Sequence, residues 1–141
     1  MAKNLTWCRR DIVRLPCYLA LCCSEEEYLR EMKRKKIPIA DVPEFPKWPT
    51  SANVSFFTHE GEPDIALVCL DPVQAKKRGL IATLALLVHE ATHVWQHTLR
   101  ELGEKEPSAE FEAYSMQAIS QELFEAFIEW ARRNDFTFDT P

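Results

Sequence analysis

The first third of the chain contains one apolar segment and one amphipathic helix. Leu15–Cys23 is almost entirely apolar, and acidic residues follow it directly. Ser24 can cap the start of a helix, and Glu27 three residues later completes a capping box. We therefore expect a helix over Ser24–Lys36, which stops before Pro38. Further prolines make the next segment an irregular connection: Pro43, Pro46 and Pro49.

Two apolar runs in the middle of the chain predict a β-hairpin. Val54–Thr58 and Ile65–Leu70 have the length of strands, and the five residues His59–Pro63 between them are expected to form the loop. Asp71 can then cap a short helix that has Pro72 at its first position. Gly79 marks the end of that helix.

The last sixty residues predict two long helices. Leu80–Leu102 is apolar nearly all round in its first half, so we expect that half to be buried on every side, with Gly103 as the stop. Ser108–Arg133 is amphipathic, and Asn134 can close it in a left-handed conformation. The apolar stripe of this second helix repeats at helical spacing: Met116, Ile119, Leu123, Phe127 and Trp130.

This pattern favours one α+β domain over residues 1–141, in which a short antiparallel hairpin packs on the two long helices. Residues 1–50 would supply the N-terminal helix and the proline-rich connection, and residues 51–134 the functional core. Leu15–Cys23 has the outline of a signal peptide, but Pro16 interrupts it and no small-residue cleavage site follows. No run reaches the roughly 18 apolar residues of a membrane span. We therefore expect Leu15–Cys23 to be a core segment of a cytoplasmic protein.

Composition and charge exclude several classes of function. The 141 residues include three glycines, so the glycine-rich loops of common nucleotide sites are missing. The net charge of −5 opposes binding to nucleic acid. The basic run Lys33–Lys36 falls at a helix end, where cations complement the helix dipole. Five cysteines without Cys-x-x-Cys spacing indicate reduced, buried thiols rather than a disulfide framework or a zinc knuckle.

One motif carries chemistry: His89-Glu90-Ala91-Thr92-His93, which is H-E-x-x-H. Residues four apart lie one turn apart on one helix face, so the imidazoles of His89 and His93 can hold one metal ion. Glu90 projects to the flank, where it can reach a metal-bound water. Because buried polar groups need partners, a metal explains the pair better than coincidence does.

A catalytic zinc site usually has three protein ligands and one open position. His97 continues the histidine row, but it lies about 12 Å along the helix from His89, so both cannot bind one ion. We expect His97 at the edge of a pocket or in a structural role. The better candidate is Glu110, in the first turn of the next helix, where Ala113 permits close approach of the two helices. The alternative is that the acidic residues of that turn only interact favourably with the helix dipole and bind no metal.

His89-Glu90-x-x-His93 with a downstream Glu-x-x-Ala resembles the gluzincin class of zinc metallopeptidases. The run Glu110-Phe111-Glu112-Ala113-Tyr114 is similar to that of the endopeptidase and toxin branches, which carries the ligand role to Glu110. The aminopeptidase branch has eighteen residues between the second histidine and its glutamate, which gives Glu112 as the alternative. Tyr114 stands where an acid that supports a zinc-bound histidine is expected; Tyr114, Gln117 or a backbone carbonyl would replace it.

The stretch from about Val54 to Trp130 also resembles small metallopeptidases encoded by bacteriophages and prophages. These resemblances imply a zincin-like fold, one zinc ion per chain, and a peptide or protein substrate. They imply that Glu90 acts as general base and then returns the proton to the leaving amine. Oxyanion donors would come from Tyr114, His97 or His59. An edge strand would pair with the extended substrate, and Ile65–Leu70 could provide it, although a buried core strand is the more frequent use of such a sequence.

Two other functions compete with hydrolysis. The small size and the missing acid at Tyr114 fit a binding or regulatory module in which zinc is structural or the protease-like fold holds a partner without cutting it. A helical interaction protein with coincidental histidines is the third possibility. Neither nucleic acid nor a membrane is expected as a partner.

Overall fold

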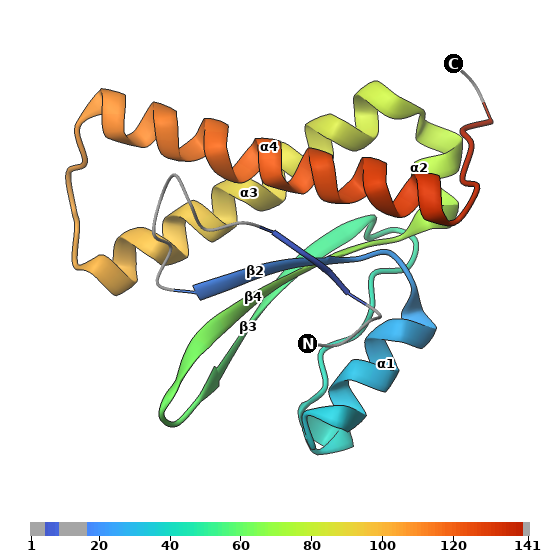
Figure 1. Ribbon diagram of the computed structural model, residues 1–141, viewed down its shortest axis with the longest axis horizontal. Helices are drawn as coiled ribbons and strands as arrows, with labels where there is room; N and C mark the ends of the chain where they lie inside the picture. The colour runs from blue at the N-terminus through green and yellow to red at the C-terminus, as the bar shows by residue number, and fades with distance from the viewer. Residues whose placement is uncertain (1–4, 9–16, 140–141) are drawn as a thin grey trace.

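The computed structural model describes residues 5–8 and 17–139, apart from the side chain of His59. The chain forms an α+β fold, as the sequence predicted. Helices cover both faces of one sheet (Figure 1). The strands are β1 (Thr6–Trp7), β2 (Cys17–Cys22), β3 (Ala52–His59) and β4 (Glu62–Leu70). The helices are α1 (Glu25–Arg34), the 3-10 helix η1 (Ile39–Asp41), α2 (Pro72–Arg78), α3 (Leu80–Leu102) and α4 (Ala109–Arg133).

The sheet is larger than the predicted hairpin and is mixed. Its strand order is β1-β2-β4-β3, with β2 parallel to β4 and the other pairs antiparallel. Leu19 and Leu21 of β2 face one side of the sheet, and Ala20 and Cys22 face the other, all buried. A strand buried on both faces has a continuous apolar run, which explains Leu15–Cys23 as a core segment. Its residues Leu15 and Pro16 lie outside the described residues.

The β3–β4 hairpin is confirmed, with longer strands and a tighter turn than expected. The turn consists of Glu60 and Gly61, and Gly61 has a φ of 81°. The expectation that Ile65–Leu70 could serve as an edge strand is wrong, because β4 lies between β2 and β3. The edge strands of the described sheet are β1 and β3, and β3 lies against α3.

The predicted burial of α3 on every side is also wrong. Ile81 is 79% exposed, and Leu80, Ala85 and Val88 are exposed as well. One side of α3 packs on the sheet and another on α4, so a third side faces solvent. Periodicity alone cannot show that its neighbours cover only part of an apolar helix.

The predicted helix starts agree with the structure, whereas α1 ends at Arg34 instead of Lys36 and Asn134 after α4 has another conformation than expected. The side chains of Ser24, Asp71 and Ser108 accept hydrogen bonds from backbone N–H groups in the first turns of α1, α2 and α4. Gly103 ends α3 in the left-handed conformation, with a φ of 68°. Asn134, expected in that conformation, has a φ of −109°, and Asp135 after it has a φ of 50°.

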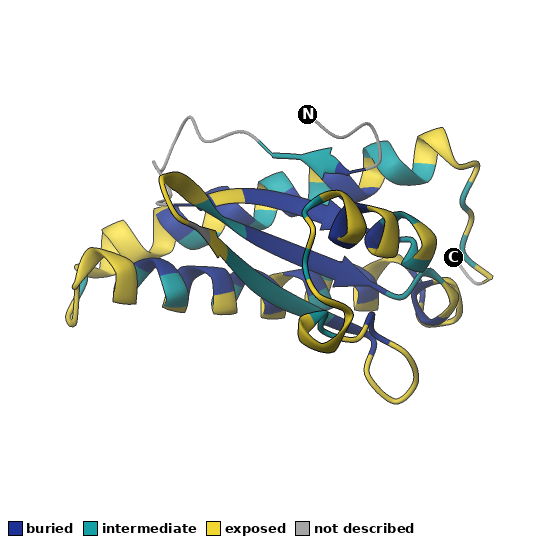
Figure 2. Cartoon of the chain, turned by 90° about the horizontal axis from the view of Figure 1, so that it is seen from below, coloured by how far each residue is buried: buried dark blue, intermediate teal, exposed yellow. Residues whose placement is uncertain are grey.

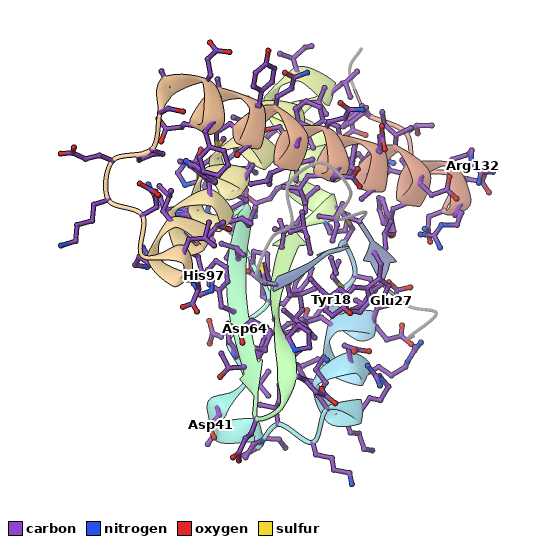
Figure 3. The ribbon with its side chains drawn as sticks, turned by 60° about the vertical axis from the view of Figure 1, so that its left-hand side comes forward. Tyr18, Glu27, Asp41, Asp64, His97 and Arg132 are labelled. Atoms are coloured by element: carbon purple, nitrogen blue, oxygen red, sulfur yellow. The ribbon has the colours of Figure 1, made fainter. Side chains whose placement is uncertain are left out.

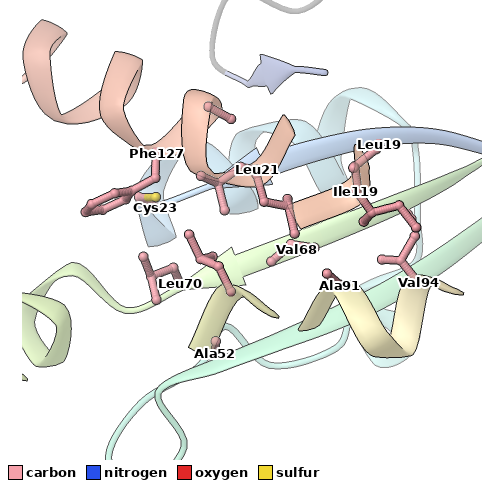
Figure 4. Close-up of a cluster of buried hydrophobic side chains, with 14 of the residues drawn as sticks. Leu19, Leu21, Cys23, Ala52, Val68, Leu70, Ala91, Val94, Ile119 and Phe127 are labelled. Atoms are coloured by element: carbon pink, nitrogen blue, oxygen red, sulfur yellow. The ribbon is translucent and has the colours of Figure 1, made fainter. Parts of the chain in front are cut away.

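The main core lies between the sheet and the pair α3 and α4. Figure 4 shows side chains from β2, β4, α3 and α4 meeting there, among them Leu21, Val68, Val94 and Phe127. A second cluster under α1 fills the opposite face of the sheet. In Figure 2 the middle of the sheet is dark blue, and the tip of the β3–β4 hairpin is yellow.

All five cysteines lie in the described part of the chain and form no disulfide; four are buried, and Cys8 is half-buried. Among the described helices none combines the length and the apolar character needed to cross a bilayer.

Candidate metal centre

The three histidines of α3 lie on successive turns but have different surroundings. His89 and His93 are exposed, whereas the side chain of His97 is only 13% exposed. Glu90, next to His89 in sequence, is 3% exposed. The H-E-x-x-H motif therefore lies at the boundary between the buried and the solvent-facing sides of α3, with its histidines outward and its carboxylate inward.

The imidazoles of His89 and His93 converge. Their ring centroids are 4.9 Å apart, and the two Nε2 atoms are separated by 3.2 Å. Two nitrogen ligands about 2.0–2.1 Å from one tetrahedral zinc ion are about 3.3–3.4 Å apart. The observed separation matches this value closely, so the pair can bind one ion with little side-chain movement.

Gln96, one turn after His93, fixes the orientation of that imidazole. Its Oε1 lies 3.2 Å from His93 Nδ1 and accepts a hydrogen bond when Nδ1 carries the proton. Nε2 then has a free lone pair that points toward His89, as a metal ligand requires. The sequence analysis did not identify Gln96, although its i+3 spacing from His93 was a usable signal.

The Glu90 carboxyl has a perturbed environment. Burial raises its pKa above the usual value, and the neighbouring imidazoles of His89 and His93 lower it in part. A desolvated carboxyl holds a proton more readily than an exposed one, which suits a group that accepts a proton and then returns it.

The structure does not bring the acids of α4 to the histidine pair. Glu112 Oε2 accepts a hydrogen bond of 3.0 Å from Trp95 Nε1. Trp95 lies two residues after His93, about 200° around the helix, so Glu112 is on the opposite side of α3. Glu110 and Tyr114 are exposed on α4, Tyr114 to 62%, and Gln117 is exposed as well. The side chain of His59 lies outside the described residues.

Within residues 5–8 and 17–139, a different group gathers three metal-ligating side chains. Ligand atoms of Asp64, His97 and Glu101 all lie within 4.8 Å of one another. His97 Nε2 is 3.9 Å from Asp64 Oδ2 and is buried without a hydrogen-bond partner. Figure 3 shows His97 on α3 near Asp64 on the sheet.

The ring of His97 is held in place by the edge strand. Phe56 of β3 stacks on it, with centroids 3.9 Å apart and planes 14° from parallel. Asp64 reaches the same place because it faces the helix side of β4, like Ala66 and Val68. The structural or pocket-edge role expected for His97 stays a prediction. Sequence reasoning missed Asp64, which a non-local contact brings here, and also Glu101, which lies one turn after His97.

No protein-family model, curated protein or solved structure matches this chain.

Proposed function

We propose that this chain is a zinc-dependent metallopeptidase with His89 and His93 as metal ligands and Glu90 as general base. The observation that carries the proposal is the 3.2 Å separation of the two Nε2 atoms, beside a buried carboxyl. The gluzincin resemblance of the H-E-x-x-H motif points to the same reaction. One zinc ion per chain is the proposed cofactor.

Zinc bound to this pair would lower the pKa of a water ligand to ~7 and polarise the scissile carbonyl. Glu90 would be the group that accepts a proton from the attacking water and returns it to the leaving amine. Gln96 keeps His93 in the tautomer that leaves Nε2 free. Tyr114, His97 and His59 remain the candidate oxyanion donors.

The third ligand is proposed to come from α4, from Glu110 with Glu112 as the alternative. Neither acid lies at the histidine pair in the structure, so either one would have to move toward it when the metal binds. Glu112 is bonded to Trp95, so its recruitment requires that this hydrogen bond break. Glu110 is exposed in the first turn of α4 and, within the part of the chain that the structure describes, has no such hydrogen bond to lose. This difference in hydrogen bonding favours Glu110 as the third ligand, in agreement with the resemblance to the endopeptidase branch.

The proposed substrate is an extended peptide that pairs with β3. This strand is at the edge of the sheet and lies against α3, so its outer backbone groups can bind a further strand near the histidines. We further propose a cytoplasmic location, because buried cysteines without disulfides are usual in reducing compartments. The net charge of −5 disfavours nucleic acid as a partner.

A specific observation also favours a second function, a metal-binding module that does not cut its partner. The acids of α4 do not reach the histidine pair, and Glu90 is 3% exposed, which limits its access to a water at the surface. In that function, the same histidines bind zinc to stabilise the fold or a partner complex.

The test uses untagged full-length chain, loaded with zinc and assayed on a mixture of peptides. Metal content is measured together with hydrolysis for the wild type, Glu90→Gln and His93→Ala. Glu106→Gln, in the exposed loop between α3 and α4, is the control for loss of one carboxylate. The peptidase predicts one zinc per chain and a loss of about 100-fold to 10,000-fold in kcat/KM for Glu90→Gln with zinc retained.

His93→Ala should lower zinc affinity about 100-fold to 1,000-fold, because a zinc site stabilised by about 10–16 kcal/mol owes roughly a quarter to each of four ligands. Stoichiometric zinc without cleavage of any peptide would favour the binding module. Failure of the wild type to bind zinc would overturn both functions.

A further inference from the structure

A large cavity lies on the face of the sheet opposite α3 and α4. It has a volume of about 890 Å³, is open to solvent on one side, and is lined by α1 and by the connection through η1 to Lys47. Buried Met32 and Phe45 lie at its inner side. Leu29, 52% exposed, and Ile39, 94% exposed, also line it. A cavity of this size falls within the range of about 300–1,000 Å³ that is typical of small-molecule sites.

The four basic residues at the end of α1, Lys33–Lys36, fall into two groups with different contacts. Arg34 and Lys35 form ion pairs with Glu31, a carboxylate that is only 2% exposed. Lys33 and Lys36 line the cavity instead, and neither forms an ion pair with any residue that the structure describes. The run therefore does more than complement the helix dipole.

The other charged residues of the cavity lining do not neutralise these two amines. Lys47 forms an ion pair of 3.0 Å with Glu25, at the first turn of α1, whereas Lys33 and Lys36 are near its last turn. Glu44 is exposed and contributes one further carboxylate. The cavity thus combines an apolar interior with two unpaired cations at one end of α1.

Lys36 also occupies an unusual backbone conformation. Its φ is 57°, in the left-handed region where glycine is the usual residue after a helix. The N–H of Lys36 bonds to Lys33 O and that of Ile37 to Met32 O, which turns the chain back over the end of α1. A long cationic side chain at a position that favours glycine suggests a function for that side chain.

We propose that this cavity binds a small amphiphile, with its apolar body against Met32, Phe45 and Ile39 and a carboxylate at Lys33 and Lys36. The apolar lining selects the body of the ligand, and the amines of Lys33 and Lys36 select an anionic head over a neutral or cationic one. Binding would cover Ile39 and Leu29, which are otherwise exposed to water. The inference is independent of the metal centre, because the sheet separates the two sites.

The test compares three twelve-carbon probes that differ only in the head group: dodecanoate, dodecanol and dodecyltrimethylammonium. Each is titrated calorimetrically below its micelle concentration into the full-length chain. Dodecanoate should bind with one site and at least tenfold more tightly than dodecanol, and the cationic probe weakest of all. Equal affinities for all three probes, or no binding of dodecanoate, would overturn the proposal.

Variants identify where the head group binds. Lys33→Gln/Lys36→Gln should weaken dodecanoate at least tenfold and leave dodecanol within twofold. Lys77→Gln/Lys105→Gln removes the same charge from exposed positions on α2 and in the α3–α4 loop, and should change neither. Ile39→Ser should weaken both probes. Equal effects of the two lysine double variants on dodecanoate would show a general charge effect and contradict the assigned site.

Discussion

Replacing Gln96 with leucine tests whether the histidine pair is a built metal site. The substitution keeps the size and helix propensity of the side chain but removes the acceptor 3.2 Å from His93 Nδ1. Because Gln96 is exposed, the stability of the fold should change by less than about 0.5 kcal/mol. A change in zinc affinity would therefore come from His93, whose imidazole loses the bond that selects its tautomer.

The magnitude follows from the geometry of that bond. Loss of a group that orients a metal-bound histidine typically costs about 10-fold to 100-fold in affinity. The distance of 3.2 Å is at the long end of the usual hydrogen-bond range, and the bond is accessible to water. Both facts place the expected effect at the lower limit, a loss of about tenfold, which corresponds to about 1.4 kcal/mol.

The assay is competition for zinc with a chromophoric chelator of known affinity, at fixed pH and ionic strength. Gln96→Glu retains an acceptor and should bind zinc at least as tightly as the wild type. Gln121→Leu, an exposed glutamine on α4, is the matched control and should have no effect. A zinc affinity of Gln96→Leu within twofold of the wild type would refute the orienting role of Gln96. An equal loss of zinc affinity in Gln96→Glu and Gln96→Leu would refute it as well.

Three further predictions concern stability and reactivity. In protein from which metal has been removed by a chelator, burial raises the pKa of Glu90 in the folded state above the unfolded value of 4.5. The protonated Glu90 side chain therefore contributes fully to the free energy of unfolding at pH below 4.5, and this contribution is lost as the pH rises through the raised pKa. Glu90→Gln should therefore raise the melting temperature at pH 7 and lose this advantage near pH 4; an equal shift at both values would contradict the assignment. Burial, with the carboxylates of Glu122 and Glu125 adding to it, raises the pKa of Cys8 to about 12, so native protein at pH 8 should resist alkylation of Cys8, whereas urea-unfolded protein should react fully in the same mass-spectrometric assay. Phe127→Ala should cost about 3–5 kcal/mol in urea unfolding, because Phe127 is 1% exposed, whereas Ile128→Ala, at a position 57% exposed, should cost under about 1 kcal/mol; similar losses would refute the assigned core.

Local signals predicted the helix starts and the H-E-x-x-H geometry, because both depend on residues within one or two turns. Ser24, Asp71 and Ser108 cap helices as expected, and the spacing of His89 and His93 alone puts them on one face. These features need no knowledge of what the helix packs against.

Non-local contacts account for what the sequence did not predict. The apolar run of β2 has no alternation, so periodicity could not distinguish a strand from a helix, nor show that it pairs parallel to β4. Asp64 meets His97 only through the packing of β4 near α3, and Glu112 meets Trp95 only through the crossing of α3 and α4. Such partners become visible only when the elements are assembled.

The position of β2 has a consequence for any attempt to shorten this protein. A chain that began at residue 51 would keep every histidine of α3 and every acid of α4. It would also lose the neighbour that covers one side of β4 along Asp64–Cys69. Exposed, apolar and unpaired, that side would recruit another fragment as its replacement strand. Truncation at the proline-rich connection should therefore yield aggregates rather than a smaller folded domain.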